Sequence, residues 1–132
     1  LKKINQMVQV ILKKFLIICI CVSFLSCKNE SKLPDPLEAG WEGETVCEVI
    51  HEDDKMRILK CIFQPGVGHE KHEHQPHFGY TLKGGTFSIT DSKGTKTIEV
   101  ETGTTWNKDE VSEHEVLNVG DTTAEYLIIE SK

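Results

Sequence analysis

The chain has 132 residues and a formal net charge of −6, with 15 basic and 21 acidic side chains. This length accommodates one domain, and the acidic balance disfavours binding to phosphate backbones. No basic cluster follows Lys32, so we expect no nucleic-acid partner.

Residues 1–26 are expected to form a secretory signal peptide. Four lysines precede an uninterrupted apolar run from Phe15 to Leu25, which is the layout of such a signal. The run is about half of the ~20 apolar residues that span a bilayer, so a permanent transmembrane helix is the weaker alternative. Removal of the four lysines leaves the mature chain with a net charge near −10.

The segment Phe24-Leu25-Ser26-Cys27 resembles the lipobox of bacterial lipoproteins. It departs from that pattern at Phe24, where such boxes more often carry Leu. The resemblance implies that Cys27 is acylated and becomes the mature N-terminus. The protein would then be exported and lipid-anchored to the bacterial membrane, on its periplasmic or cell-surface side.

Residues 27–40 are predicted to form a tether between this lipid and a folded domain. They are polar, contain Pro34 and Pro36, and show no apolar period of a strand or a helix. Trp41, at the end of the tether, is expected to pack on the outside of the domain.

Residues 41–132 are predicted to form an all-β domain. Apolar and β-branched residues come in runs of five to seven, broken by Gly, Asp, Asn and Pro, with no convincing helical repeat. Many short strands at this spacing indicate a barrel or sandwich. The expected strands are Thr45–His51, Lys55–Phe63, His77–Lys83, Thr86–Asp91, Lys96–Glu101, Thr104–Trp106, His114–Val119 and Ala124–Glu130.

Two hairpins follow from the turns between these strands. Asp91-Ser92-Lys93-Gly94 has the composition of a type I turn. A second hairpin, centred on Asp54, would place Cys47 directly opposite Cys61. Opposite residues of an antiparallel pair are close enough for a disulfide. Two buried thiols that pack as small apolar groups remain the alternative.

Histidines cluster in the middle of the domain, at His69, His72, His74 and His77, and His114 follows about forty residues later. Residues two apart on an extended strand point to the same face, so His72 and His74 can converge on one ion. Pro76 favours a bend that would return His77 to that side. A His-rich polar loop without a specific ion is the alternative for this tract.

Two spaced motifs in this part of the chain resemble those of the cupin superfamily. Gly66-x5-His72-x-His74-x2-His77-x6-Gly84 follows the first cupin motif, with His77 where Glu is usual and one residue fewer in the middle. The second segment begins at Gly103 and keeps every spacing of the second motif, with Asp109 and Val111 in place of its Pro and Gly. It ends in His114-x3-Asn118. The resemblance covers roughly residues 44–131 and implies a small, jelly-roll-like β-barrel.

By the same resemblance, His72, His74 and His114 are metal ligands, and His77 takes the position of the usual carboxylate ligand. Imidazoles suit a divalent transition metal such as Zn, Fe, Ni or Cu. An all-imidazole set leaves the full positive charge on the ion. His69 is expected to face solvent at the barrel mouth, and His51 lies in an acidic turn, so neither is assigned as a ligand.

The residues after the histidines predict a pocket for a small molecule. Gly79 and Thr81 are small and follow His77 on the inward face, which would leave open space above the metal. Trp106 and Asn118 are assigned to the same pocket, although core packing is an equal alternative for Trp106. Phe78 and Tyr80 fall on the opposite face and are expected to pack between sheets.

Function does not follow from this fold class, which hosts enzymes and binders alike. The leading hypothesis is a metal-dependent enzyme, oxygenase- or isomerase-like, that acts on a small polar molecule. A non-catalytic module that binds or senses a small molecule is the alternative, because no Tyr, Lys or Glu is identified as an acid or base in the pocket. A homodimer is left open.

Overall fold

The computed structural model describes residues 33–132, which form one compact unit. Nine strands account for most of it: β1 (Cys47–Glu52), β2 (Met56–Phe63), β3 (Gly68–His74), β4 (His77–Lys83), β5 (Gly85–Asp91), β6 (Gly94–Val100), β7 (Thr105–Lys108), β8 (Ser112–Asn118) and β9 (Ala124–Ser131). The signal peptide and Cys27 lie outside the described residues. Within residues 33–132, no helix is long and apolar enough to cross a membrane.

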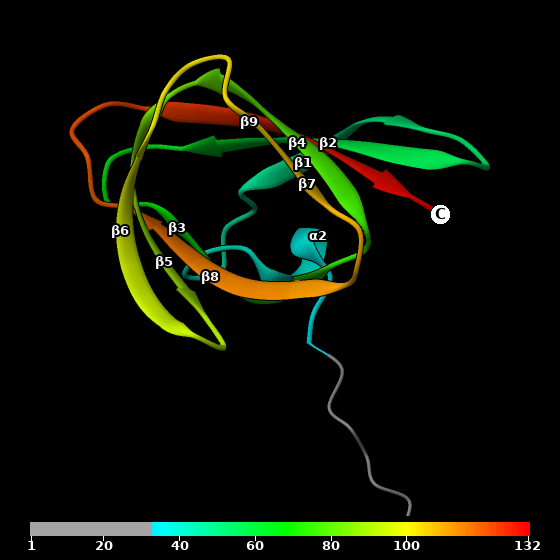
Figure 1. The fold of residues 1–132 in the computed structure, drawn as a ribbon, viewed down its shortest axis with the longest axis horizontal. Coiled ribbons are helices and arrows are strands. Elements are labelled where there is room, and N and C mark those ends of the chain that lie inside the picture. Colours follow the sequence, from blue (N-terminus) through cyan, green and yellow to red (C-terminus); the bar gives the residue numbers. More distant parts are fainter. Residues whose placement is uncertain (1–32) are drawn as a thin grey trace, which may run out of the picture. The chain divides into compact units, whose positions relative to one another are not determined.

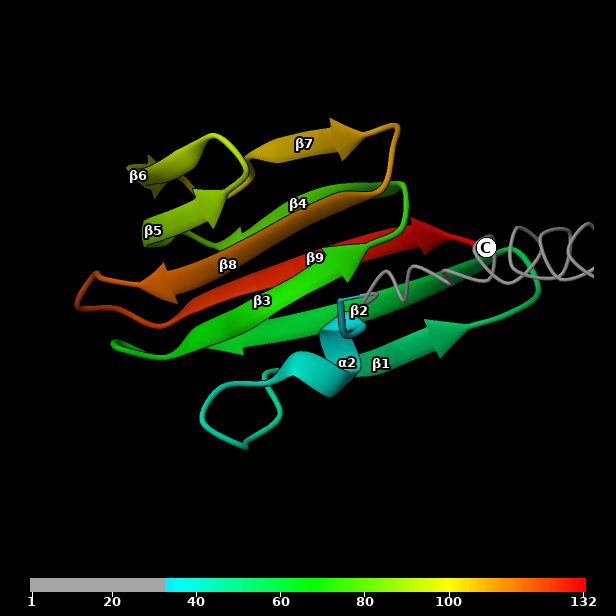
Figure 2. The ribbon, with the colours of Figure 1, turned by 90° about the horizontal axis from the view of Figure 1, so that it is seen from below.

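The strands form two antiparallel sheets that face each other around a common interior (Figure 1). One sheet has five strands in the order β1-β2-β9-β4-β7, and the other has four in the order β3-β8-β5-β6. Consecutive strands β3 and β4 belong to different sheets, so the chain crosses from one sheet to the other between His74 and His77 (Figure 2). The predicted all-β barrel is confirmed.

The core lies between the two sheets and is built from alternate residues of their strands. Phe63, Phe87 and Tyr126 pack edge to face, with ring centroids 5.4–6.0 Å apart, and Leu59 and Ile128 are buried beside them. Each large apolar side chain of this kind contributes about 1.5–3 kcal/mol by leaving water. The aromatic cluster therefore holds the sheets together at one end of the barrel.

The two predicted hairpins are confirmed. Asp91 pairs with Gly94 across the β5–β6 turn, and the Asp91 carboxylate accepts a hydrogen bond from the Lys93 amide. Cys47 pairs with Cys61 in the predicted register of β1 and β2, and the two residues form a disulfide. The register shifts between Val49 and His51, where β1 carries a bulge.

Strand β3 is missing from the set of strands predicted from the sequence. Its residues, GHEKHEH, contain none of the β-branched or aromatic side chains that signal a strand. Pairing with β8 holds it in the sheet instead, with His72 opposite His114 and His74 opposite Ser112. Tertiary pairing thus overrides a weak local propensity.

The described part of the predicted tether, from Leu33 to Gly40, is folded against the barrel, which corrects that part of the prediction. Helix α2 (Pro36–Ala39) begins at Asp35, whose side chain forms a capping box with Glu38. Pro36 is buried, and the amides of Glu70 and Glu73 donate hydrogen bonds to the carbonyl oxygens of Gly40 and Pro34. We call residues 33–40 the N-terminal strap.

Three aromatic residues lie elsewhere than expected. Phe78 and Tyr80 are 43% and 37% exposed on the outer face of the five-stranded sheet, because the inward positions of β4 belong to His77, Gly79 and Thr81. Trp41 packs against the core, where its ring leaves no room for a side chain at Gly68.

Candidate metal centre

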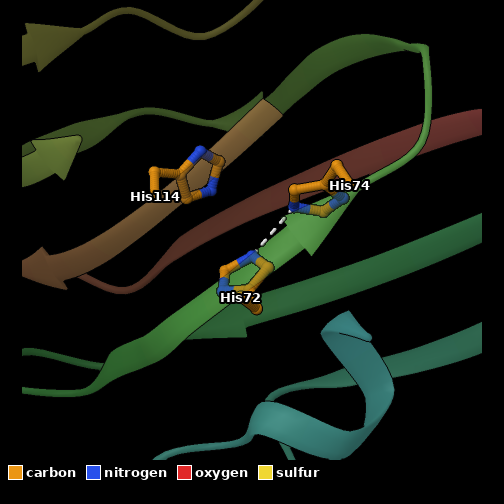
Figure 3. A group of neighbouring side chains, drawn as sticks. All are labelled: His72, His74 and His114. Atoms are coloured by element: carbon orange, nitrogen blue, oxygen red, sulfur yellow. Dashed lines mark hydrogen bonds between the residues drawn. The ribbon is translucent and has the colours of Figure 1, made fainter. Parts of the chain in front are cut away.

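Three histidines from two neighbouring strands converge inside the barrel (Figure 3). His72 and His74 come from β3, and His114 comes from β8 directly opposite His72. Each offers a ring nitrogen, and these nitrogen atoms lie within 4.8 Å of one another. This set contains the three residues that the two sequence motifs predicted as ligands.

The hydrogen bonds of His72 and His74 fix which nitrogen of each ring carries the proton. The Nδ1 atom of His72 lies 2.6 Å from the Glu70 carbonyl oxygen, and that of His74 lies 2.7 Å from a Glu130 carboxylate oxygen. Both oxygens accept hydrogen bonds, so both Nδ1 atoms must donate. The Nε2 atom of each neutral ring is therefore a bare lone pair.

These two bare nitrogen atoms face each other across 2.9 Å. Two acceptors at this distance repel unless a cation lies against both lone pairs or one ring carries an additional proton. A metal ion bound by Nε2 of both rings satisfies this requirement, and it needs imidazoles in their neutral form. The donor set of this chain therefore fits a transition-metal ion.

Burial keeps two of the candidate ligands, His72 and His114, neutral. Desolvation, followed by the like charges of neighbouring histidines, lowers the pKa of His72 to about 2. The same causes lower the pKa of His114 to about 3. Both rings are consequently deprotonated throughout the physiological range, as metal ligands must be.

His77 is buried beside this group but is not one of its three members. Its ring centroid lies 4.8 Å from that of His74, and its Nδ1 donates to the Gln75 carbonyl oxygen at 2.9 Å. Its Nε2 atom is thus also a free acceptor. The role of His77 as a fourth ligand stays a prediction.

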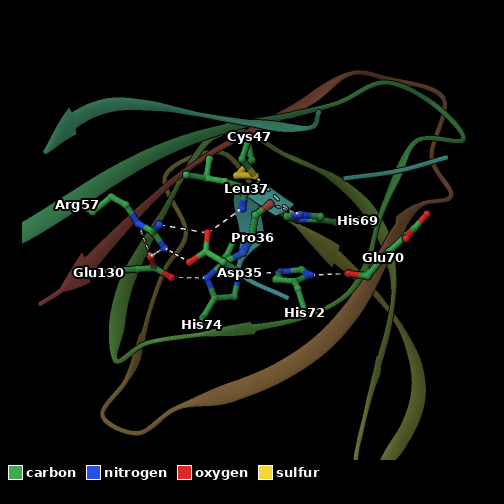
Figure 4. Close-up of a disulfide and its surroundings, with 11 residues drawn as sticks. Asp35, Pro36, Leu37, Cys47, Arg57, His69, Glu70, His72, His74 and Glu130 are labelled. Atoms are coloured by element: carbon green, nitrogen blue, oxygen red, sulfur yellow. Dashed lines mark hydrogen bonds and ion pairs between the residues drawn. A yellow bond between two sulfur atoms is a disulfide. The ribbon is translucent and has the colours of Figure 1, made fainter. Parts of the chain in front are cut away.

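His69 is buried, with 2% of its surface exposed, which corrects the expectation that it faces solvent. Its Nε2 donates to the Pro36 carbonyl oxygen in the N-terminal strap at 2.7 Å. Its ring stacks on His72 with centroids 3.8 Å apart and lies next to the disulfide, with Nδ1 3.9 Å from the Cys47 sulfur (Figure 4). His69 therefore packs against the ring of the candidate ligand His72. Desolvation lowers the pKa of His69 to about 4. His51 is exposed, as expected.

Sequence reasoning missed Glu130, a carboxylate buried next to the histidines with 1% of its surface exposed. One oxygen accepts from His74, and the other accepts from the Arg57 guanidinium, which also binds Asp35 of the strap (Figure 4). Burial alone would raise the pKa of Glu130, but the hydrogen bonds from His74 and Arg57 bring it below its usual value. A chain of charged contacts thus connects the strap to a candidate ligand.

A signal for Glu130 was present in the sequence. Every second residue of β9 faces the interior, namely Ala124, Tyr126, Ile128 and Glu130. The alternation of side chains along a strand therefore places Glu130 on the same side as the core residues. Its presence corrects the expectation that no Glu lies at the site, while the three candidate ligands remain imidazoles.

Two of the predicted pocket residues, Trp106 and Asn118, already have packing or hydrogen-bond partners within the protein. The Trp106 ring occupies the volume directly above Gly79, where an added Cβ would collide with it. Asn118 is fully buried and donates to the carbonyl oxygens of Phe63 and Thr122, while its own oxygen accepts from the Gly120 amide. Its amide closes a loop and is not available to a ligand.

Other polar groups remain in the interior. Thr81 is fully buried and Tyr126 is 7% exposed, and neither hydroxyl has a hydrogen-bond partner among residues 33–132. The two residues are opposite each other in the register of β4 and β9. Buried hydroxyls without partners are available to a ligand or to water.

A pocket of about 360 Å³ opens at the outer end of the charged contacts. Glu130 and Arg57 form part of its wall, which also includes Asp35, Glu52, Gln75, Ser131 and Lys132. The Glu130 carboxylate therefore separates this pocket from His74.

Comparison with solved structures identifies the fold. A cupin domain from Bordetella pertussis Tohama I superimposes with a TM-score of 0.62 at 23% identity, over 66% of this chain and 92% of that one. The fold is a cupin fold. No protein-family model matches the sequence, and no curated protein matches it at a significant level.

Cupin-fold neighbours include enzymes. A sugar phosphate isomerase from a cupin superfamily, from Silicibacter pomeroyi, has a TM-score of 0.53 at 17% identity, over 75% of this chain and 66% of that one. The polyketide cyclase RemF from Streptomyces resistomycificus has a TM-score of 0.54 at 17% identity, over 64% of this chain and 63% of that one. At these identities the likeness establishes the fold alone.

Proposed function

We propose that this protein binds a divalent transition metal through His72, His74 and His114 and is a metal-dependent enzyme that acts on a small polar molecule. The observation that carries the metal site is the pair of bare Nε2 atoms facing each other at 2.9 Å, with His114 beside them. Imidazole nitrogens suit Zn, Fe, Ni or Cu. A bound ion of this kind supplies Lewis acidity toward an oxygen atom of a small molecule.

The protein's own residues have separate tasks in this proposal. The backbone carbonyl oxygen of Glu70 and the carboxylate of Glu130 accept the Nδ1 protons of His72 and His74, and so would orient both Nε2 atoms toward the ion. Thr81 and Tyr126 supply hydroxyl groups inside the barrel that can bind an oxygen-bearing molecule. The cupin-fold isomerase and cyclase support an enzyme as the first candidate.

A non-catalytic module that binds or senses a small molecule is the second candidate. It is favoured by the position of Trp106, which fills the space above Gly79 and limits the room for a substrate beside the metal. Elemental analysis followed by turnover assays separates the two candidates. Iron together with O2 consumption supports the enzyme, whereas an inert zinc site supports the binding module.

The metal site itself is tested by measuring the metal content of the purified chain. His72→Ala and His114→Ala should each abolish stoichiometric metal, because each removes one of three converging nitrogen atoms. His51→Ala is the matched control, since His51 is an exposed histidine of the same chain, and it should retain the metal. A full metal complement in His114→Ala would overturn the proposed site.

The same proposal places the protein outside the cytoplasm, anchored to the bacterial membrane by a lipid on Cys27. Its support is the sequence pattern of residues 1–27, a charged start, an apolar run and a lipobox-like end. Acylation needs the Cys27 thiol, so Cys27→Ser should abolish labelling with fatty acid and release the chain from membranes. Continued labelling of the Cys27→Ser chain would contradict this anchor.

A further inference from the structure

The N-terminal strap, residues 33–40, lies between the edge strands of the two sheets. β1 is an edge of the five-stranded sheet and β3 is an edge of the four-stranded one, and helix α2 lies against both (Figure 2). The amides of Glu70 and Glu73 on β3 donate to carbonyl oxygens of the strap at 2.8 Å and 3.1 Å. The strap therefore covers the barrel beside β3, the strand that carries the candidate ligands His72 and His74.

Two lines of contact join these ligands to the strap (Figure 4). In the first, the Glu130 carboxylate accepts from His74 at 2.7 Å and from Arg57 at 2.9 Å. The Arg57 guanidinium also donates to both carboxylate oxygens of Asp35, at 3.1 Å and 2.7 Å. Two parallel hydrogen bonds of this kind require a fixed relative orientation of guanidinium and carboxylate. The position of Asp35 therefore depends on how Arg57, Glu130 and His74 are held.

The second line runs through His69. Its ring stacks on that of His72 with centroids 3.8 Å apart, and its Nε2 donates to the Pro36 carbonyl oxygen at 2.7 Å. His69 and Pro36 are both buried, so this hydrogen bond cannot be exchanged for one with water while the strap is in place. A displacement of the His72 ring would therefore reach the strap through His69.

We propose that the strap is a gate on the metal site: binding of an ion by His72 and His74 favours its closed position, and loss of the ion favours its release. The inference rests on the proposed metal site. The bare Nε2 atoms of the two rings lie 2.9 Å apart and repel each other unless a cation lies against both. An occupied site thus holds both rings where the strap contacts need them. By linkage, the closed strap strengthens ion binding by the same factor.

The contacts of the strap suit a gate that opens without unfolding the barrel. The Asp35 side chain is 37% exposed, and an ion pair with an exposed partner contributes little to stability. Asp35 and Arg57 both line the pocket of about 360 Å³, so separation of this pair would open the pocket on the strap side. Release of the strap would also uncover His69, and with it the side of the barrel that leads to His72.

The test measures amide hydrogen exchange of residues 35–40 in the full chain, with Zn²⁺ bound and after its removal by a chelator. The closed strap keeps the amides of Leu37, Glu38 and Ala39 hydrogen-bonded to Asp35. Bound Zn²⁺ should therefore slow their exchange about fivefold or more. Unchanged exchange in a chain that binds one Zn²⁺ would overturn the gate and leave the metal site standing. A chain that binds no Zn²⁺ would overturn both.

A double variant separates the gate from a general stabilisation of the fold by the ion. Asp35→Asn keeps a side-chain oxygen that can cap helix α2 but removes the charge that pairs with Arg57. His69→Phe keeps an aromatic ring against His72 but removes the donor to Pro36. Exchange in the strap of the double variant should no longer respond to Zn²⁺. A chelator should also extract Zn²⁺ from it about fivefold or more faster than from the unsubstituted chain.

Asp35→Asn alone leaves the barrel interior unchanged and should show a smaller effect in the same direction. Glu44→Gln is the matched control, because it removes one exposed carboxylate just after the strap that forms no ion pair among residues 33–132. It should match the unsubstituted chain in both measurements. A full response to Zn²⁺ in the double variant, or equal extraction rates in the double variant and Glu44→Gln, would overturn the proposal.

Discussion

At the scale of single residues, the candidate metal centre depends on side chains that are not themselves among the three candidate ligands. Glu130 uses both carboxylate oxygens, one for His74 and one for Arg57. Hydrogen-bond partners of this kind fix the tautomer and orientation of a ligand ring. The orientation of His74 therefore depends on a residue from the last strand of the barrel.

Glu130→Gln should weaken metal binding without removing any of the three ligands. A glutamine offers one acceptor and one donor group, so either His74 or Arg57 would face an amide N–H. We expect a loss of about 10- to 100-fold in metal affinity, measured by competition with a chelator. Glu125→Gln is the matched control, because Glu125 lies on the same strand and binds only exposed or half-buried lysines. Equal affinities in the two variants would show that Glu130 does not position His74.

Gly79 has a packing role that also follows at the residue scale. An added Cβ would collide with the Trp106 ring, so Gly79→Ala should destabilise the fold by about 1–3 kcal/mol through overpacking. Denaturant unfolding measures this loss. Trp106→Leu in the Gly79→Ala chain should recover part of it, and strictly additive losses in the double variant would argue against the contact.

At the scale of elements, β1 is held to the sheet by a covalent bond as well as by its ladder with β2. β1 is an edge strand of the five-stranded sheet, so its backbone is paired with a neighbouring strand on one side only. The disulfide between Cys47 and Cys61 closes a segment with a sequence separation of 14. It also stands against His69, which stacks on a candidate ligand.

Replacement of both cysteines by alanine should lower the free energy of unfolding. Closure of a loop of this length contributes about 3 kcal/mol in the chain-entropy account. Denaturant unfolding of the double variant measures the loss, and the reduced wild-type chain should lose a similar amount. Mass spectrometry of the non-reduced, alkylated chain tests the disulfide directly. Alkylated thiols at both Cys47 and Cys61 would contradict it.

At the scale of the whole molecule, the candidate metal centre is connected to both sheets and to the N-terminal strap. His72, His74 and His114 belong to the four-stranded sheet, whereas Glu130 and His77 belong to the five-stranded one. Asp35 of the strap reaches the same group through Arg57. An ion bound here would therefore stabilise the contact between separate layers of the fold.

Added Zn²⁺ should raise the melting temperature of the metal-free chain. Binding to the folded state alone stabilises it by about 2.7 kcal/mol at a free concentration 100 times the Kd. For a domain of this size that corresponds to a shift on the order of 10 °C, measured by thermal unfolding. His114→Ala should show almost no shift. An equal shift in both chains would mean that Zn²⁺ acts at another site.

Local patterns in the sequence determined the β-rich architecture, the two hairpins and the placing of His72 and His74 on one face of a strand. Alternation and turn composition depend on residues close in the chain, and the shared side of His72 and His74 follows from the period of a strand. His114 was assigned by the resemblance of its segment to the second cupin motif. The pairing of Cys47 with Cys61 could be predicted because the position of one turn sets the register of the two strands beside it.

Tertiary structure alone decided the partners that lie far apart in the chain. Glu130 reaches His74 across 56 positions and Asp35 reaches Arg57 across 22. The sequence has no local signal for either pair, because such contacts depend on which strands become neighbours. The same holds for His69, which became buried, and for Phe78 and Tyr80, which became exposed. The alternation of side chains along a strand shows which residues share a face. Only the packing of the two sheets decides which of the two faces is buried, and against which residues.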